Sequence, residues 1–171
     1  EYGLYERTVT FNFKYNGKTY ISREMAKAMN DRMALDDVIF DYVVPVPMFK
    51  DKENRRGYNQ SFLLAKYFVL NFENKKNVDE SEKPVLADAL LRLKDTKPMR
   101  GLSPIERKEN INNMFAVKPK WCKLFEGKRI LLIDDIYTTG STADECTKVL
   151  SAVGADKVYI LTFAAGSNRI I

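Results

Sequence analysis

The stretch Ile130-Leu-Leu-Ile-Asp-Asp-Ile-Tyr-Thr-Thr-Gly-Ser-Thr142 indicates both the fold and the site that this chain is expected to form. Its four leading apolar residues predict a buried strand over residues 129–134, with Asp134 and Asp135 at the carboxyl end. The hydroxyl-rich turn that follows leads into a helix, whose N-terminal N–H groups favour an anion. In open α/β sheets, ligands bind beyond the carboxyl ends of the strands. Since carboxylates accept hydrogen bonds from hydroxyl groups, this combination suits a sugar phosphate.

Length and composition are those of an ordinary globular protein. The chain has 171 residues, of which 45% are hydrophobic and 30% charged, and this length suits one well-packed domain. It contains no apolar run as long as a membrane span and no signal-peptide pattern, so we expect a cytoplasmic protein without a membrane span. The oligomeric state cannot be read from the sequence.

The cysteine and histidine content limits the kinds of catalysis and metal binding that this sequence can support. The sequence has no histidine and two cysteines, Cys122 and Cys146, which are not at metal-ligand spacing. Serine–histidine and cysteine–histidine catalysis are therefore excluded, and a zinc site within these residues is not expected. Cys146 falls on the apolar side of an expected helix and is interpreted as a core residue.

Positive charge is concentrated in two segments. The net charge is +5, and residues 92–108 and 118–129 each carry a local excess of +4. Such clusters attract phosphate, either on a small ligand or on a nucleic acid. A solvated basic face explains the same pattern equally well.

The order of the expected elements predicts an α/β fold. Strands are expected over residues 38–46, 85–93, 129–134 and 157–163, and helices over 58–72, from Ser103 to about Met114, and from a capping box of Thr142 and Glu145 to Gly154. This alternation predicts a mostly parallel, twisted sheet with helices on both faces.

The first 35 residues are expected to form a small N-terminal hood on a core of residues 36–171, within a single compact domain. In the hood, Ser22 is expected to cap a helix whose Met25, Met29 and Met33 form an apolar stripe. Residues 9, 11 and 13 are apolar and alternate as in a strand, although a helix is possible there as well.

The 130–142 segment resembles the signature of type I phosphoribosyltransferases, in which four apolar residues and two acids precede a Thr-Thr-Gly-x-Thr loop. Two further segments resemble the ComF-type competence-protein branch of that family. They are Pro45-Val46-Pro47 with Arg56-Gly57-Tyr58-Asn59-Gln60, and the series from Leu91-Arg92 through Thr96, Leu102, Glu106-Arg107 and Asn110 to Phe115. The resemblance runs from about residue 5 to the end. Three departures stand out: the four-cysteine zinc ribbon often found at the start of ComF proteins is absent from these residues, Met99 stands where glutamine is expected, and Lys52 where arginine is usual.

The resemblance implies a glycosyltransferase that binds phosphoribosyl pyrophosphate and displaces pyrophosphate at ribose C1. It places Asp134 and Asp135 on the ribose hydroxyls, one of them assisting proton transfer, and it forms the phosphate loop from Thr138, Thr139, Gly140, Ser141 and Thr142. The candidate pyrophosphate site is the loop carrying Arg55, Arg56 and Gly57, because arginine binds polyphosphate bidentately. Residues 94–102 are expected to cover the site, with Arg92, Lys94 and Arg107 as candidates of lower rank. The expected cofactor is Mg²⁺, held mainly by substrate oxygens rather than by protein side chains.

The acceptor cannot be read from the sequence, and two classes of function stay open. One is a phosphoribosyltransferase linked to competence and DNA uptake. The other is a non-catalytic ligand sensor or single-stranded-DNA-binding adaptor in natural transformation, working with DNA or with a protein of the competence machinery. Both acids and the complete hydroxyl loop favour ligand binding, but a sensor needs the same contacts as an enzyme.

Overall fold

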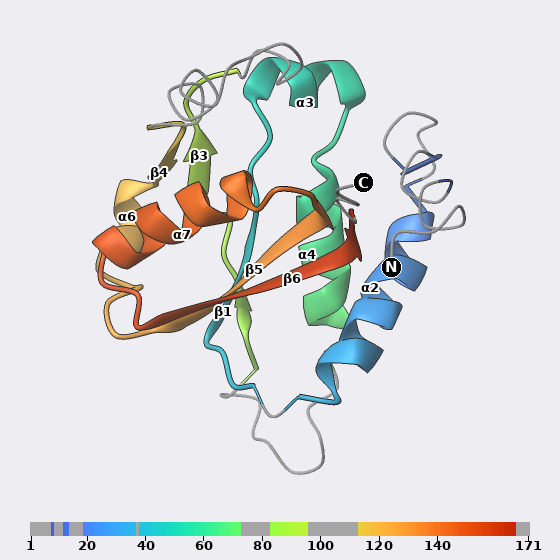
Figure 1. Cartoon of the computed structure of the whole chain (residues 1–171), viewed down its shortest axis with the longest axis horizontal. Helices are drawn as coiled ribbons and strands as arrows, with labels where there is room; N and C mark the ends of the chain where they lie inside the picture. The colour runs from blue at the N-terminus through green and yellow to red at the C-terminus, as the bar shows by residue number, and fades with distance from the viewer. Residues whose placement is uncertain are drawn as a thin grey trace, which may run out of the picture.

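The computed structural model describes residues 8, 12–13, 19–36, 38–72, 83–95 and 113–166. Its centre is a parallel sheet in the order β2-β1-β5-β6, formed by β1 (Tyr42–Pro45), β2 (Val85–Leu86), β5 (Arg129–Tyr137) and β6 (Lys157–Ala165). The helices are α2 (Ile21–Met33), α3 (Lys50–Arg56), α4 (Gln60–Leu70), α6 (Pro119–Cys122) and α7 (Ser141–Ala152). Helices lie on both faces of the sheet (Figure 1), so the predicted fold class of a mostly parallel sheet flanked by helices is confirmed.

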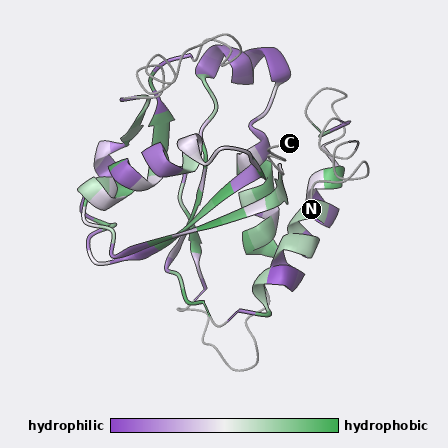
Figure 2. Cartoon of the chain, in the orientation of Figure 1, coloured by the Kyte–Doolittle hydropathy of each residue, from purple (hydrophilic) through white to green (hydrophobic). Residues whose placement is uncertain are grey.

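Alternating residues of β5 supply the two apolar layers of the core. Leu131 and Ile133 pack into a cluster with residues of α2 and α4, whereas Ile130 and Leu132 pack into a second cluster with residues of α7. All four side chains are fully buried, and each contributes about 1.5–3 kcal/mol to folding. Figure 2 shows the central strands as hydrophobic and α3 as hydrophilic, and α3 contributes no buried residue.

The predicted strand over 85–93 is wrong, because this segment forms two strands in two different sheets. Ala87 still donates to the Val43 carbonyl oxygen (2.9 Å), but the chain then turns, and Ala89 donates to the Ala87 carbonyl oxygen (2.8 Å). Strand β3 (Leu90–Arg92) pairs instead with β4 (Phe115–Val117) in an antiparallel ladder. The apolar pattern is continuous across this turn, and therefore it did not reveal the change of sheet.

Both predicted capping arrangements are wrong, although both helices exist. Helix α2 begins at Ile21, so Ser22 lies in its first turn, where its Oγ donates to the Thr19 carbonyl oxygen (2.5 Å). Helix α7 has Gly140 as its N-cap, at a φ of 83°, and no side-chain hydrogen bond caps it. The expected end of α7 is confirmed, because Gly154 follows the last turn with a φ of 92°.

The remaining expectations agree with the structure except at the element ends. Strand β1 lies within the predicted range 38–46 and α4 within 58–72, whereas β6 runs two residues beyond the predicted end at 163. The methionines of α2 (Met25, Met29 and Met33) are buried, and so is Cys146, as expected. The helix predicted from Ser103 to about Met114 lies outside the described residues except for Asn113 and Met114, which are not helical, and residues 9 and 11 lie outside them too. The division into hood and core stays a prediction, although α2 shares a core cluster with α4 and β5. Over the described ranges, no helix has the length and apolar character needed to cross a membrane.

Candidate functional site

The carboxyl ends of β1, β5 and β6 meet at one edge of the sheet, because these strands are parallel. Strand β5 continues to Tyr137, which pairs with Ala165 of β6. The strand predicted over 129–134 is thus too short, and the two acids lie inside the strand, before its last residues Ile136 and Tyr137. Asp134 is partly buried, and Asp135 is 6% exposed. The pairing with β6 therefore fixes the backbone at Asp134 and at Ile136, on either side of Asp135.

Helix α4 begins at the same edge, and Asn59 determines where it starts. The Asn59 Oδ1 accepts hydrogen bonds from the N–H groups of Ser61 (3.0 Å) and Phe62 (3.4 Å). Its Nδ2 donates to the carbonyl oxygen of Val46 (3.0 Å), just after β1. Asparagine is a preferred N-cap residue, and here the cap also ties α4 to the sheet edge.

Ser61 connects α4 directly to the paired acids. Its Oγ donates to Asp134 Oδ1 (2.8 Å), and the N–H group of Asp135 donates to the same oxygen (2.9 Å). These two hydrogen bonds hold the Asp134 carboxylate in one orientation. Asn59 and Ser61 were not predicted as site residues. An asparagine directly before an apolar helix was the available signal for the cap, whereas no local signal pointed from Ser61 to Asp134.

Residues 138–142 form the turn from β5 into α7. Thr138 and Thr139 are exposed, while Ser141 and Thr142 are partly buried in the first turn of the helix. The Thr139 Oγ1 and the Ser141 Oγ are 3.0 Å apart. The first N–H groups of a helix lack acceptors within the helix, and α7 has no side-chain cap to supply one. The structure thus brings hydroxyl groups and a helix N-terminus together, as the sequence predicted.

Gly140 is buried in this turn beneath the ring of Tyr137. A Cβ atom at Gly140 would overlap the Tyr137 hydroxyl group and would lie 2.9 Å from its Cζ atom. The Tyr137 backbone is itself held in place, because its carbonyl oxygen accepts a hydrogen bond from the Gly166 N–H group (2.7 Å). Glycine is therefore required at position 140 both by its positive φ and by the close approach of the tyrosine.

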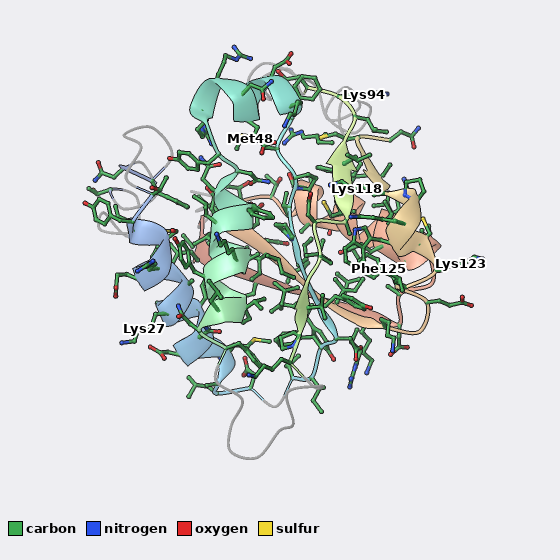
Figure 3. The ribbon with its side chains drawn as sticks, turned by 180° about the vertical axis from the view of Figure 1, so that it is seen from behind. Lys27, Met48, Lys94, Lys118, Lys123 and Phe125 are labelled. Carbon is green, nitrogen blue, oxygen red and sulfur yellow. The ribbon has the colours of Figure 1, made fainter. Side chains whose placement is uncertain are left out.

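The candidate pyrophosphate residues do not lie in a loop, as predicted, but at the end of α3. Arg55 and Arg56 occupy the last turn of this helix, and Gly57 ends it with a φ of 85°. A run of charged residues without an apolar stripe gave no signal for a helix here. Lys52 of α3 forms an ion pair with Asp95, just beyond β3, at 2.5 Å. Lys94 is exposed, and Figure 3 shows it at the same end of the molecule as α3.

Arg92, a site candidate of lower rank, is partly buried in β3 and packs on Phe115 of β4. Its guanidinium carbon is 5.7 Å from the centre of the Phe115 ring. Burial lowers the pKa of Arg92, and the charges of Asp95 and Asp134 act in the opposite direction. Burial likewise raises the pKa of the Cys146 thiol, with Asp134 reinforcing this effect and Arg92 opposing it. Arg107 and residues 96–102 lie outside the described residues.

Sequence comparisons identify relatives of this chain. It is 30% identical over 155 residues to competence protein F of Haemophilus influenzae, a match covering 86% of this chain and 62% of the relative. It is 29% identical over 124 residues to the DNA utilization protein YhgH of Escherichia coli, covering 70% of this chain and 47% of the relative. For competence protein ComFC of Bacillus subtilis, the match is 30% over 121 residues and covers 66% and 39%. No protein-family model matches the chain.

The fold and the site define an α/β protein with paired acids and a hydroxyl-rich loop at the carboxyl edge of a parallel sheet. The comparisons confirm the resemblance to ComF-type competence proteins, because competence protein F and competence protein ComFC are relatives of this chain. It spans 62% of the length of the first relative and 47% of the second.

Similar folds occur among solved structures. Glutamine phosphoribosylpyrophosphate amidotransferase from B. subtilis, in complex with ADP and GMP, gives a TM-score of 0.49 at 17% identity, with 81% of this chain and 25% of that chain covered. Hypoxanthine phosphoribosyl transferase from Trypanosoma cruzi gives a TM-score of 0.43 at 12% identity, with 88% and 74% covered.

Proposed function

We propose that this chain binds phosphoribosyl pyrophosphate at the carboxyl edge of its sheet and transfers the phosphoribosyl group to an unidentified acceptor. The observation that carries this proposal is the uninterrupted arrangement from Asp134 and Asp135 through residues 138–142 into α7, with Asp134 oriented by Ser61. The names of the relatives, which refer to competence and to DNA utilization, support a link to DNA uptake.

In this proposal, Asp134 and Asp135 accept hydrogen bonds from the ribose hydroxyl groups. An ionised carboxylate only accepts hydrogen bonds, and vicinal hydroxyls are matching donors. Because Asp134 Oδ1 already accepts from Ser61 Oγ and Asp135 N–H, the carboxylate meets the sugar without first losing rotational freedom. A preoriented group of this kind lowers the cost of holding the ribose for displacement at C1.

The 5-phosphate is assigned to residues 138–142. The hydroxyl groups of Thr139 and Ser141 lie 3.0 Å apart, and both can donate to phosphate oxygens. The N-terminus of α7 adds N–H donors and the positive end of the helix dipole. The pairing of Tyr137 with β6 fixes the start of the loop, so the phosphate and the ribose contacts are held in register.

The leaving pyrophosphate is assigned to Arg55, Arg56 and Gly57, with Arg92 as a further candidate. Asp134 and Asp135 supply the hard oxygen ligands that Mg²⁺ prefers, so the residues at this edge fit the ion. Within the described residues, no group of three or more acidic or cysteine side chains could hold a metal by itself. When bound, Mg²⁺ supplies positive charge that stabilises the departing pyrophosphate.

The binding proposal is tested with the double variant Asp134→Asn/Asp135→Ala. We expect calorimetry to show loss of phosphoribosyl pyrophosphate binding in the presence of Mg²⁺, with an unchanged circular dichroism spectrum. A matched control is Asp31→Asn/Asp36→Ala, which makes the same changes at exposed positions on and just after α2. Unchanged affinity in the first double variant would refute the assignment of the two acids.

The phosphate loop is tested with Thr139→Val, which removes a hydroxyl group at nearly constant volume. A hydrogen bond to a charged group contributes about 1.5–3 kcal/mol, or roughly 10- to 100-fold in affinity. We expect this loss for phosphoribosyl pyrophosphate and also for ribose 5-phosphate, because both carry the same phosphate. The control Thr139→Ser keeps the hydroxyl group and should bind as the wild type does; equal binding by Thr139→Val would contradict the loop assignment.

Transfer is tested by pyrophosphate release from phosphoribosyl pyrophosphate with Mg²⁺ and a panel of bases, amines and nucleic acids. We expect release with one acceptor class, and loss of release in Asp134→Asn/Asp135→Ala. Tight binding with no release for any acceptor would favour the ligand-sensing alternative over an enzyme.

A second candidate function, single-stranded DNA binding, is favoured by the segment 118–129. Lys120 lies 5.4 Å from the centre of the Trp121 ring, and that ring stacks on Phe125 at 5.6 Å. Lys120 and Lys123 are exposed, and Figure 3 shows Lys123 at the periphery and Phe125 within the fold. Basic and aromatic side chains together are typical of single-strand binding surfaces. Salt-dependent DNA binding that Lys120→Glu/Lys123→Glu abolishes and phosphoribosyl pyrophosphate leaves unchanged would support this function.

A further inference from the structure

Buried polar residues gather at the edge of the sheet that carries the acids. Among the described residues, the polar side chains in the buried class are Ser22, Gln60, Ser61 and Asp135. The last three lie at this edge, with exposed fractions of 2%, 5% and 6%. Ser61 is engaged with Asp134. Gln60, the first residue of α4, directly precedes it.

The side-chain nitrogen of Gln60 has no hydrogen-bond partner among the residues that the structure describes. A buried donor without a partner costs about 1–3 kcal/mol, and native proteins satisfy nearly all such groups. Asn30, Trp121 and Thr147 also have one unbonded side-chain atom each, but these residues are partly exposed. In Asn30, moreover, the amide nitrogen donates to the Phe68 carbonyl oxygen (3.1 Å). Among the described residues, Gln60 thus keeps a costly unbonded donor one residue before Ser61, whose hydroxyl group binds Asp134.

We propose that Gln60 is a specificity residue, whose amide nitrogen donates a hydrogen bond to an oxygen atom of the ligand bound at this edge. This inference rests on the proposed function, in which that ligand is a sugar phosphate. The carboxylates of Asp134 and Asp135 recognise hydroxyl hydrogens, but they cannot bind an oxygen that carries no proton. The Gln60 amide supplies the complementary contact, to a phosphoryl, ring or carbonyl oxygen.

If Gln60 binds the ligand, replacing it should weaken ligand binding without lowering the stability of the protein, whereas loss of a structural residue would lower the stability. Gln60→Met keeps the length of the side chain and removes both polar atoms. We expect the Tm of the ligand-free protein to stay the same or to rise, because an unbonded buried donor has been removed. We expect affinity for phosphoribosyl pyrophosphate to fall about 10-fold, the loss of one hydrogen bond to the ligand. Gln60→Glu, which has no donor when ionised, should lose at least as much affinity.

The matched comparison is Ser61→Ala at the next position. Ser61 makes a hydrogen bond inside the protein, so this variant should lower both the Tm and the affinity. A Gln60→Met variant that binds as tightly as the wild type would overturn the role of Gln60 and leave the proposed function standing. A Tm loss in Gln60→Met as large as that in Ser61→Ala would also overturn it, because Gln60 would then act structurally. A wild-type protein that does not bind phosphoribosyl pyrophosphate would refute the proposed function itself.

Discussion

Replacing Gly140 with alanine tests whether the phosphate loop is built around the packing of Tyr137 on the glycine. Gly140 has a φ of 83°, and an alanine in the left-handed region costs about 1–2 kcal/mol. The new Cβ atom would also lie 2.9 Å from Tyr137 Cζ, well inside the optimal carbon–carbon separation of about 3.5–4.0 Å. Forced displacement of packed groups adds about 1–3 kcal/mol. The expected loss for Gly140→Ala is therefore about 2–5 kcal/mol.

Gly127 provides the control, because it shares the backbone conformation but not the neighbour. Its φ is 68°, and a Cβ atom there would meet nothing within 4 Å. Gly127→Ala should thus lose only the backbone part, about 1–2 kcal/mol. Urea denaturation followed by circular dichroism measures both values. In a Tyr137→Ala background, the cost of Gly140→Ala should fall to that of Gly127→Ala.

Binding of ribose 5-phosphate supplies the functional readout of the same experiment. Gly140→Ala displaces the tyrosine ring or the loop, so its affinity should fall, whereas Gly127→Ala should bind as the wild type does. Equal stability losses for the two glycine variants would refute the reasoning, because Tyr137 would then yield without cost. So would an unchanged cost of Gly140→Ala in the Tyr137→Ala background.

Two further predictions concern titrating groups. The Arg129 side chain donates to Asp41 through Nε (3.2 Å) and Nη2 (3.1 Å) and holds the pKa of Asp41 below its ordinary value of 3.8. Because the folded-state pKa is lowered, this stabilisation is present above about pH 4 and is lost as the pH falls through the folded-state value. The difference in the free energy of unfolding between wild type and Asp41→Asn should therefore disappear in acid. An equal difference at pH 3 and pH 7 would contradict the prediction. Burial raises the pKa of the Cys146 thiol, so iodoacetamide should alkylate the partly exposed Cys122 and spare Cys146 until the protein is denatured. Peptide mass spectrometry checks this, and equal labelling of the two native thiols would show that Cys146 is accessible.

Local sequence patterns predicted the features that depend on interactions between residues close together in the chain. The apolar run before Asp134 predicted the central strand, because a strand buried on both faces needs continuous apolar residues. The hydroxyl-rich turn and the apolar face of α7 predicted the loop and its helix. The capping box at Thr142 failed because Gly140, at a positive φ, is the N-cap and starts the helix two residues before the expected cap.

Contacts between distant segments were not predictable in this way. Ser61 and Asp134 are 73 residues apart, and no periodicity or motif connects them. Arg92 lies over Phe115 only because β3 and β4 pair in a separate sheet, and a single apolar run hid that change of partner. The site was therefore predictable as a strand, two acids and a loop, whereas the side chains that position it come from tertiary structure.

The pairing of β1 with β5 has a consequence for folding during synthesis on the ribosome. Tyr42 pairs with Ile130, so the two central strands are joined by a loop of roughly 88 residues, whose closure entropy costs about 4 kcal/mol. Contacts this distant in sequence slow folding. Until the last quarter of the chain has been translated, the methionine face of α2 and the apolar face of α4 lack the strand against which they pack. We therefore expect a nascent or truncated chain that stops before Arg129 to stay unfolded, to be bound by chaperones and to be degraded by proteases.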